Sequence, residues 1–247
     1  MMRLLSLLML MLLSACAGTG SSKSDAMVRQ RAQIHSELAG GYYAQGQMAI
    51  ALEEFTLSAK IDPDYAVAYN GLGLVHGALG EDAKAEANFK QSLKLDPNSS
   101  EAHNNFGTFL CSRNRIDESI AEFMAALKNP LYPTPETAYL NAGVCALKKQ
   151  DDKNAEIYLQ KALQIRPDLR QASGQLARIY FDRNEYMKAK THLQFAMMAQ
   201  NPGPELAWLG VRISRELQDR NGEASYSLLL KNKYPDSEQT RKLLSGE

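Results

Sequence analysis

The sequence has no excess of either charge and no long apolar stretch beyond its first residues. Its 28 lysines and arginines are matched by 28 aspartates and glutamates. We therefore expect no nucleic-acid partner, because there is no basic surplus to release phosphate counterions. After residue 15 no apolar run approaches the roughly 20 residues that a membrane helix needs. The body of the chain is thus expected to fold outside the bilayer.

The sequence is also poor in the residue patterns of catalytic sites. None of its four histidines has a second histidine, a cysteine or an acid at a metal-site spacing such as HExxH. There is no Walker A, GxGxxG or GxSxG motif. We predict a protein that is not an enzyme and that uses no metal, no cofactor and no small-molecule substrate. The histidines, which we expect to be packing residues, are His35, His76, His103 and His192.

The first residues resemble a bacterial export signal. Arg3 precedes an almost unbroken apolar run at residues 4–13, which is too short to span a bilayer but suits a signal-peptide core. The run ends in Leu-Ser-Ala before Cys16, which resembles the lipobox of bacterial lipoproteins, where the thiol is acylated and the chain is cut before it. We predict a signal peptide at residues 1–15 and a lipid anchor at Cys16. The alternative is an ordinary signal cleavage nearby that leaves no lipid.

A lipidated Cys16 would carry three acyl chains, more than the two signals that stable membrane attachment requires. Ala17 follows the cysteine. In enterobacterial-type sorting an aspartate at that position would retain the protein in the inner membrane. The predicted localisation is therefore the outer membrane, lipid-anchored and facing the periplasm. Residues 16–27, which include the small polar stretch TGSSKSD, are predicted to form a flexible tether.

Internal repeats decide the predicted fold. Residues 53–63 (EEFTLSAKIDP) align with residues 87–97 (ANFKQSLKLDP) at a shift of 34 residues, which is the period of the tetratricopeptide repeat. We predict an all-α, right-handed superhelix over residues 28–247, built from about six helix hairpins and a C-terminal capping helix. The predicted repeats lie near residues 32–63, 66–97, 100–131, 136–167, 170–202 and 205–235, and the predicted cap spans 236–247.

The repeat pattern has a local physical basis. Small residues such as Gly73 and Ala85 let the two helices of a hairpin approach closely, and Phe89 fills the space beside them. An Asp-Pro pair ends the second helix, because a residue before proline avoids the helical region. One hairpin cannot bury its apolar face alone, whereas stacked neighbours form a continuous core.

The two remaining cysteines fall at equivalent places in neighbouring repeats. Cys111 and Cys145 both lie late in the first helix of their repeats, the third and the fourth. An oxidising periplasm permits a bridge between them, and we predict a disulfide. The alternative is two buried free cysteines that behave as small apolar residues.

The concave face of such a superhelix is lined mainly by the first helix of each repeat. Neutral amides beside apolar side chains suit an extended or helical peptide. The alternative for the asparagines is that they satisfy only local backbone groups. The first hairpin contributes two further candidates outside its own core. The predicted groove residues are Tyr43, Met48, Asn70, Leu74, Asn104, Thr108, Leu140, Val144 and Phe181.

Two segments carry a more specific resemblance. Residues 104–115 (NNFGTFLCSRNR) and 130–150 (PLYPTPETAYLNAGVCALKKQ), together with the lipobox and the six repeats, resemble the type IV pilus biogenesis and stability lipoproteins, the PilF/PilW family of pilotins. The resemblance covers essentially the whole mature chain. It implies a protein that binds the outer-membrane secretin of the type IV pilus and promotes its outer-membrane localisation and multimerisation. Pilus biogenesis and twitching motility would then depend on it.

A second function stays open at this point. A tetratricopeptide-repeat lipoprotein of the same build could instead act as a scaffold that recruits peptidoglycan hydrolases to the outer membrane. In both cases the expected partners are a protein and, through the lipid, a membrane.

Overall fold

The described part of the chain is entirely helical. The computed structural model describes the backbone of residues 19–246 and the side chains of residues 24–246. Within that range it consists of 13 α-helices joined by short turns, with no β-strand. The predicted all-α fold class is confirmed. The predicted signal peptide and the predicted anchor Cys16 lie outside the described residues.

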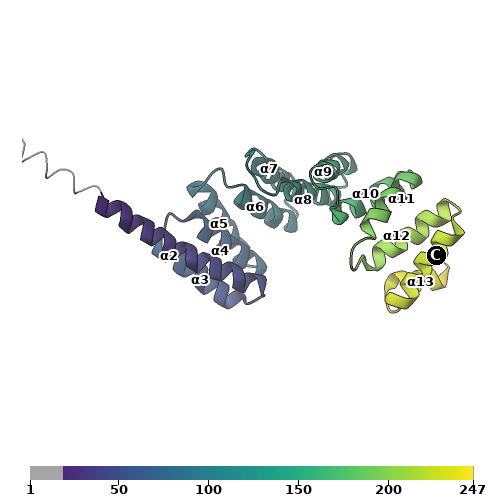
Figure 1. Cartoon of the computed structure of the whole chain (residues 1–247), viewed down its shortest axis with the longest axis horizontal. Helices are drawn as coiled ribbons and strands as arrows, with labels where there is room; N and C mark the ends of the chain where they lie inside the picture. The colour runs from purple at the N-terminus through teal and green to yellow at the C-terminus, as the bar shows by residue number, and fades with distance from the viewer. Residues whose placement is uncertain (1–18, 247) are drawn as a thin grey trace, which may run out of the picture. The chain divides into compact units, whose positions relative to one another are not determined.

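Most consecutive helices pack in pairs as hairpins, for example α2 with α3 and α4 with α5 (Figure 1). The same pairing joins α8 to α9, α10 to α11 and α12 to α13. The helices are α2 Thr19–Ala44, α3 Met48–Ile61, α4 Ala66–Ala78, α5 Asp82–Leu95, α6 Ser100–Ser112, α7 Ile116–Ala126, α8 Pro135–Lys148, α9 Asp152–Ile165, α10 Arg170–Asp182, α11 Tyr186–Ala196, α12 Gly203–Glu216, α13 Arg220–Lys233 and α14 Glu238–Ser245.

The helices divide into two compact units. Unit 1 ends at Phe109 and unit 2 begins at Leu110, so the boundary falls within α6. Unit 1 has an aromatic centre in which the rings of Phe89 and Phe106 stack with centroids 5.4 Å apart, with Phe109 beside both. The largest core cluster of unit 2 is made by residues of α8 to α12.

Small residues set the close approach of helices within a hairpin. A Cβ atom added to Gly73 of α4 would lie 2.7 Å from the ring of Phe89 on α5, closer than real side chains approach. The turns between paired helices each need a residue with positive φ. Gly80 supplies it in unit 1 at φ 75°, as glycine does at little cost. In unit 2 the same turn position is held by Asn114, Gln150, Asn184 and Gln218.

The two ends of the chain differ in detail from the sequence-based prediction. Residues 16–27 were predicted to be a flexible tether, whereas from Thr19 onward they form the first turns of α2. The segment contains no proline and runs into a long helix without a break, and each added residue then gains one hydrogen bond at low cost. At the other end the capping helix begins at Glu238, and its N-cap is Ser237, whose hydroxyl accepts from the Thr240 N–H at 3.1 Å.

Candidate binding surfaces

In each repeat, three positions of the first helix face the preceding repeat, and we call them the stacking positions. Their direction is fixed by Cys145, which is bonded to Cys111 on α6 of the repeat before it. From α4 to α10 all of them are buried and apolar. They are Ala68, Leu72 and Val75 in α4, Ala102, Phe106 and Phe109 in α6, Ala138, Ala142 and Cys145 in α8, and Ala172, Leu176 and Ile179 in α10.

The same positions of α2 are exposed, because no described helix precedes it. Ile34 and Leu38 hold two of them, and their side chains are 49% and 48% exposed. Met27, seven residues before Ile34 and therefore on the same side of the helix, is 61% exposed. We call Met27, Ile34 and Leu38 the open face. Terminal repeats ordinarily present a polar outer side, so this apolar one is a candidate interaction site.

The C-terminal end is closed instead. The hydroxyl of Thr240 on α14 is buried and donates to the carbonyl oxygens of Tyr234, at 2.7 Å, and Leu230, at 3.2 Å. Leu243 packs against the core cluster around Leu230, while Leu244 is 68% exposed. A short helix with a largely polar outer side therefore covers the last hairpin, as the repeat architecture requires.

The groove residues predicted in unit 1 have varied surroundings. Tyr43 is half-buried and packs on the core cluster around Phe55, and Met48 and Leu74 are also half-buried. Asn70 is buried, and its side-chain oxygen accepts from the Asn105 amide at 3.2 Å. That hydrogen bond joins α4 to α6, so the side chain of Asn70 serves the contact between repeats.

The remaining unit 1 candidates are neighbours on α6. Thr108 is exposed, and its hydroxyl donates to the backbone carbonyl of Asn104 at 2.9 Å. Asn104 itself is buried. Local bonding of this kind is the alternative that the sequence left open for these polar residues.

In unit 2 the prediction for Leu140 needs correction. Leu140 is 6% exposed and belongs to the main core cluster, and Val144 packs against that cluster. Phe181 is 8% exposed in the same cluster. The neighbouring helix α10 supplies large apolar residues such as Leu176, which cover the side of α8 that the repeat register alone assigns to a groove.

The predicted bridge between Cys111 and Cys145 is present as a disulfide. It joins α6 to α8, with the two Cα atoms 5.9 Å apart. Cys145 is completely buried, and its sulfur also lies 3.3 Å from the hydroxyl of Ser119 on α7. The bridge ties the first helix of the fourth repeat to the first helix of the third, and the contact with Ser119 adds the second helix of the third.

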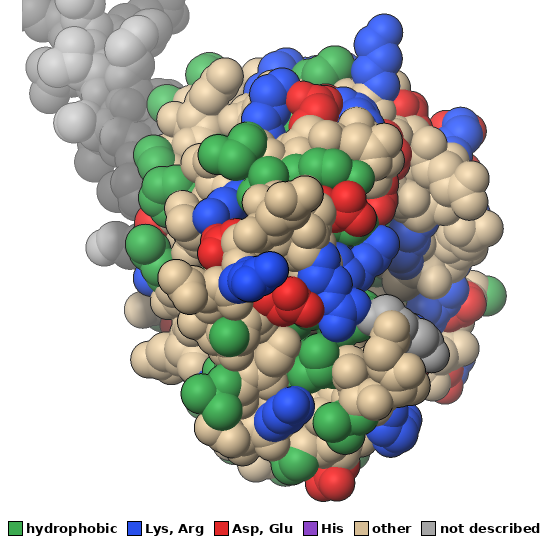
Figure 2. Space-filling model, turned by 90° about the vertical axis from the view of Figure 1, so that its right-hand side faces the viewer, with side chains coloured by type: hydrophobic (Ala, Val, Ile, Leu, Met, Phe, Trp, Pro, Cys, Tyr) green, Lys and Arg blue, Asp and Glu red, His purple; other side chains and the backbone are tan. Residues whose placement is uncertain are grey.

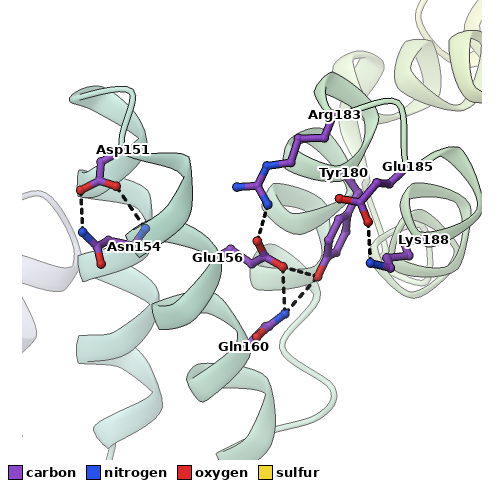
Figure 3. Close-up of polar contacts among 8 residues, drawn as sticks. All are labelled: Asp151, Asn154, Glu156, Gln160, Tyr180, Arg183, Glu185 and Lys188. Atoms are coloured by element: carbon purple, nitrogen blue, oxygen red, sulfur yellow. Dashed lines mark hydrogen bonds and ion pairs between the residues drawn. The ribbon is translucent and has the colours of Figure 1, made fainter.

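A polar network on unit 2 links α9 to α10 and to Arg183, the residue that follows α10 (Figure 3). The Tyr180 hydroxyl on α10 donates to Glu156 Oε1 on α9 at 2.7 Å, and Gln160 donates to the same oxygen at 3.1 Å. Arg183 pairs with the other oxygen of Glu156. Burial acts to raise the pKa of Glu156, but the hydrogen bonds from Tyr180 and Arg183 outweigh it, so the pKa lies below its ordinary value. On α11, Lys188 pairs with Glu185 and lies over the Tyr180 ring.

His192 packs on this network. Its ring stacks on Tyr180 with centroids 5.3 Å apart, and burial lowers the pKa of His192.

Elsewhere His35 pairs with Glu54 through Nδ1 at 2.6 Å. Among the residues with described side chains, no group of three or more His, Cys, Asp and Glu is arranged to hold a metal ion. None of the described helices is both long enough and apolar enough to cross a membrane.

Comparison with known families identifies the repeats. Three family profiles, each described as tetratricopeptide repeat, match residues 30–98, 88–121 and 110–169. Together they span more than half of the chain, across both units.

Two type IV pilus proteins are similar over nearly the whole chain. Over 228 residues the sequence is 25% identical to the type IV pilus assembly protein PilF of Pseudomonas aeruginosa, covering 91% of this chain and 90% of that protein. The solved structure of P. aeruginosa PilF superposes with a TM-score of 0.83 at 24% identity, covering 89% of this chain and 99% of the other. PilW, described as a widely conserved type IV pilus biogenesis factor, is 30% identical with a TM-score of 0.76, covering 86% of this chain and 98% of its own.

Proposed function

The chain belongs to the tetratricopeptide-repeat family and is a relative of the type IV pilus biogenesis proteins PilF and PilW, and we propose on this basis that it is the lipid-anchored pilotin of a type IV pilus secretin. It binds the secretin, brings it to the outer membrane and promotes its multimerisation. The similarity to PilW, at 30% identity over 98% of that chain, is the observation that carries the assignment to pilus biogenesis. No catalytic step is needed for this role.

The lipid part of the proposal rests on the sequence around Cys16. The Leu-Ser-Ala-Cys motif after a short apolar run suits acylation of Cys16, which would hold the protein at the outer membrane on its periplasmic side. Helix α2 begins at Thr19, and Met27 follows about 12 Å further along it at 1.5 Å per residue. A partner on the open face would therefore be kept close to the membrane, where tethering raises its local concentration.

The open face is the surface that we assign to the secretin. In the repeats from α4 to α10 the equivalent positions are covered by the preceding repeat, whereas Ile34 and Leu38 have no such cover among the described residues. A partner helix with an apolar stripe would bury them in the way that one repeat buries the next. While the secretin is carried to the outer membrane, this contact keeps apolar surface of both proteins away from water.

Deletion of the gene tests the proposal. We expect loss of secretin multimers from the outer membrane, loss of pili and loss of twitching motility. Normal secretin rings in the deletion strain would contradict the pilotin function. Altered cell shape or division with intact rings would instead support the scaffold that recruits peptidoglycan hydrolases.

Charged substitutions on the open face make the test specific to a surface. I34D and L38D should each lower co-purification of the secretin at least about tenfold, because apolar anchors at the centre of an interface dominate its affinity. L244D is the matched control, since Leu244 is also an exposed leucine but lies on α14 at the closed end. Circular dichroism should show unchanged helix content in all three. Equal secretin binding by all three variants would remove the open face from the proposal.

A further inference from the structure

The stacking positions of α12 break the pattern of the repeats before it. The helices can be aligned on the small residue that packs against the partner helix, Ala177 in α10 and Gly210 in α12. A Cβ added to Gly210 would lie 2.7 Å from the Tyr226 ring, as expected for that position. The stacking positions of α12 are then Glu205, Leu209 and Arg212. The first and third are charged and exposed, where every earlier repeat from α4 to α10 has a buried apolar residue.

The substitution of charges for packing residues opens a hollow in unit 2. It has a volume of about 230 Å³ and is lined by residues of α10 and α12 and by Gln239 of α14. Its apolar part is made by Trp208, which is half-buried, and by Leu209, which is 5% exposed. Arg178 and Asp182 reach it from α10. The C-terminal side of the molecule, which faces the viewer in Figure 2, shows basic, acidic and hydrophobic side chains mixed over one surface.

The four charged side chains around the hollow, Arg178, Asp182, Glu205 and Arg212, have no ion-pair or hydrogen-bond partner among the described residues. Arg212 instead lies over the ring of Phe181, 4.3 Å from its centroid. Other charged groups of the same unit are paired. Arg215 contacts Glu223 at 2.8 Å, for example.

We propose that this hollow binds a peptide segment of a protein partner in which an apolar side chain is flanked by one acidic and one basic residue. The apolar side chain packs on Trp208 and Leu209, since an indole offers a large flat surface for such contacts. The acidic residue pairs with Arg178 or Arg212, and the basic residue pairs with Asp182 or Glu205. Charge complementarity selects this chemistry, because two charges of each sign stand unpaired around one apolar patch.

This site is separate from the surface assigned to the secretin. The open face lies on α2 in unit 1, whereas the hollow lies among α10, α12 and α14 in unit 2. The inference therefore does not depend on the proposed function. Loss of peptide binding at the hollow and loss of secretin binding at the open face are separate outcomes.

The chain carries its own probe for the test. Trp208 is the only tryptophan in the sequence, so tryptophan fluorescence reports on the surroundings of this one side chain, which lines the hollow. We would titrate the full-length protein, purified in detergent, with four blocked peptides that share a central leucine. The peptides differ only at the positions two residues before and two residues after this leucine. These two positions hold Asp and Lys in the first peptide, Asp twice in the second, Lys twice in the third and Asn twice in the fourth. A saturable change in Trp208 fluorescence is expected, with the Asp/Lys peptide binding most tightly.

Two charge-neutralising variants and one control separate the contacts. R212Q should weaken the Asp/Lys and two-Asp peptides by about two- to fivefold and spare the two-Lys peptide, as expected for loss of an exposed ion pair. D182N should weaken the Asp/Lys and two-Lys peptides and spare the two-Asp peptide. R220Q changes an exposed arginine of α13 outside the hollow and should alter none of them. Absence of saturable binding by all four peptides, or equal affinity for all four, would overturn the proposal.

Discussion

Tyr180 on α10 donates its hydroxyl hydrogen to Glu156 on α9 over 2.7 Å, and this bond joins the fifth repeat to the fourth. The same carboxylate pairs with Arg183, so one acid of the fourth repeat holds two side chains of the next. Contacts of this kind fix how one hairpin is placed on its neighbour, and they can be tested one at a time.

The first prediction concerns this bond. Y180F removes the hydroxyl and keeps the ring, so it should lower the free energy of unfolding by about 1–2 kcal/mol, the value of a hydrogen bond to a charged group that is partly exposed. Urea denaturation followed by circular dichroism measures the change. Y234F is a suitable control, because the Tyr234 hydroxyl bonds only an exposed asparagine side chain. Equal losses in the two variants would argue against a special role for the Tyr180 bond.

A second prediction follows from the lowered pKa of Glu156. A carboxyl whose pKa is lower in the folded protein stabilises it above the unfolded pKa of about 4.3. That contribution is lost as the pH falls through the folded pKa. The E156Q variant cannot titrate at this position, so its stability should fall less steeply than that of the wild type below about pH 4.3. Parallel stability curves in acid for the two proteins would contradict this reading.

A third prediction addresses the disulfide. The bridge between Cys111 and Cys145 closes a loop with a sequence separation of 34. On the chain-entropy model such a loop contributes about 4 kcal/mol. The C111S/C145S double variant should therefore unfold at a clearly lower urea concentration than the oxidised wild type. Mass spectrometry after unfolding without reductant should find no alkylation at these two cysteines. Two alkylated thiols would show that the bridge is not formed.

A fourth prediction compares two glycines of unit 1. G73A adds a methyl group 2.7 Å from the Phe89 ring and should destabilise the protein by about 1–3 kcal/mol through overpacking. Gly40 lies within α2 with nothing inside 4 Å of an added Cβ. G40A should therefore stabilise by about 0.5–1 kcal/mol, because alanine loses less backbone entropy in a helix. Thermal unfolding distinguishes the two, and opposite signs of the shift in Tm are the expected result.

A fifth prediction concerns the anchor. C16A removes the acceptor thiol, so the protein should move from the membrane fraction to the soluble periplasmic fraction, and the secretin should accumulate at the inner membrane. Immunoblots of fractionated cells measure both. S14A is a control that keeps a small residue in the motif. Unchanged membrane fractionation of C16A would remove the lipid anchor from the account.

The hairpins could be predicted from the sequence because their determinants are local. Gly73 meets Phe89 only 16 residues later, and the pattern of small and large residues that makes this contact recurs at a period of 34. The disulfide could be predicted for the same reason, since equivalent positions in successive repeats are neighbours.

The groove residues were harder to predict, because their exposure depends on how each repeat is rotated on the next. Leu140 has the register of a groove residue, yet the apolar side chains of α10 bury it. The network around Glu156 draws on α9 and α10 with Lys188 of α11 beside it, and no motif in the sequence marks it.

One of the two surfaces is marked in the sequence by a departure from the repeat pattern. Comparing only the three stacking positions of each repeat singles out Ile34 and Leu38, which are apolar in the first repeat. Glu205 and Arg212 are singled out in the sixth repeat only after the contact of Gly210 with Tyr226 has fixed the register of α12. Such surfaces are indicated by residues that depart from the repeat pattern. A comparison of the whole chain with the repeat family does not reveal these departures, because the other positions match.

The first and last helices differ in what they leave exposed. Helix α14 covers the last hairpin, whereas α2 exposes an apolar side. On the proposed function, a secretin helix can pack on the first helix of the stack and has no equivalent place on the last one. Each copy of this protein then binds one secretin helix at this end, so every bound secretin segment is accompanied by one set of acyl chains at the bilayer.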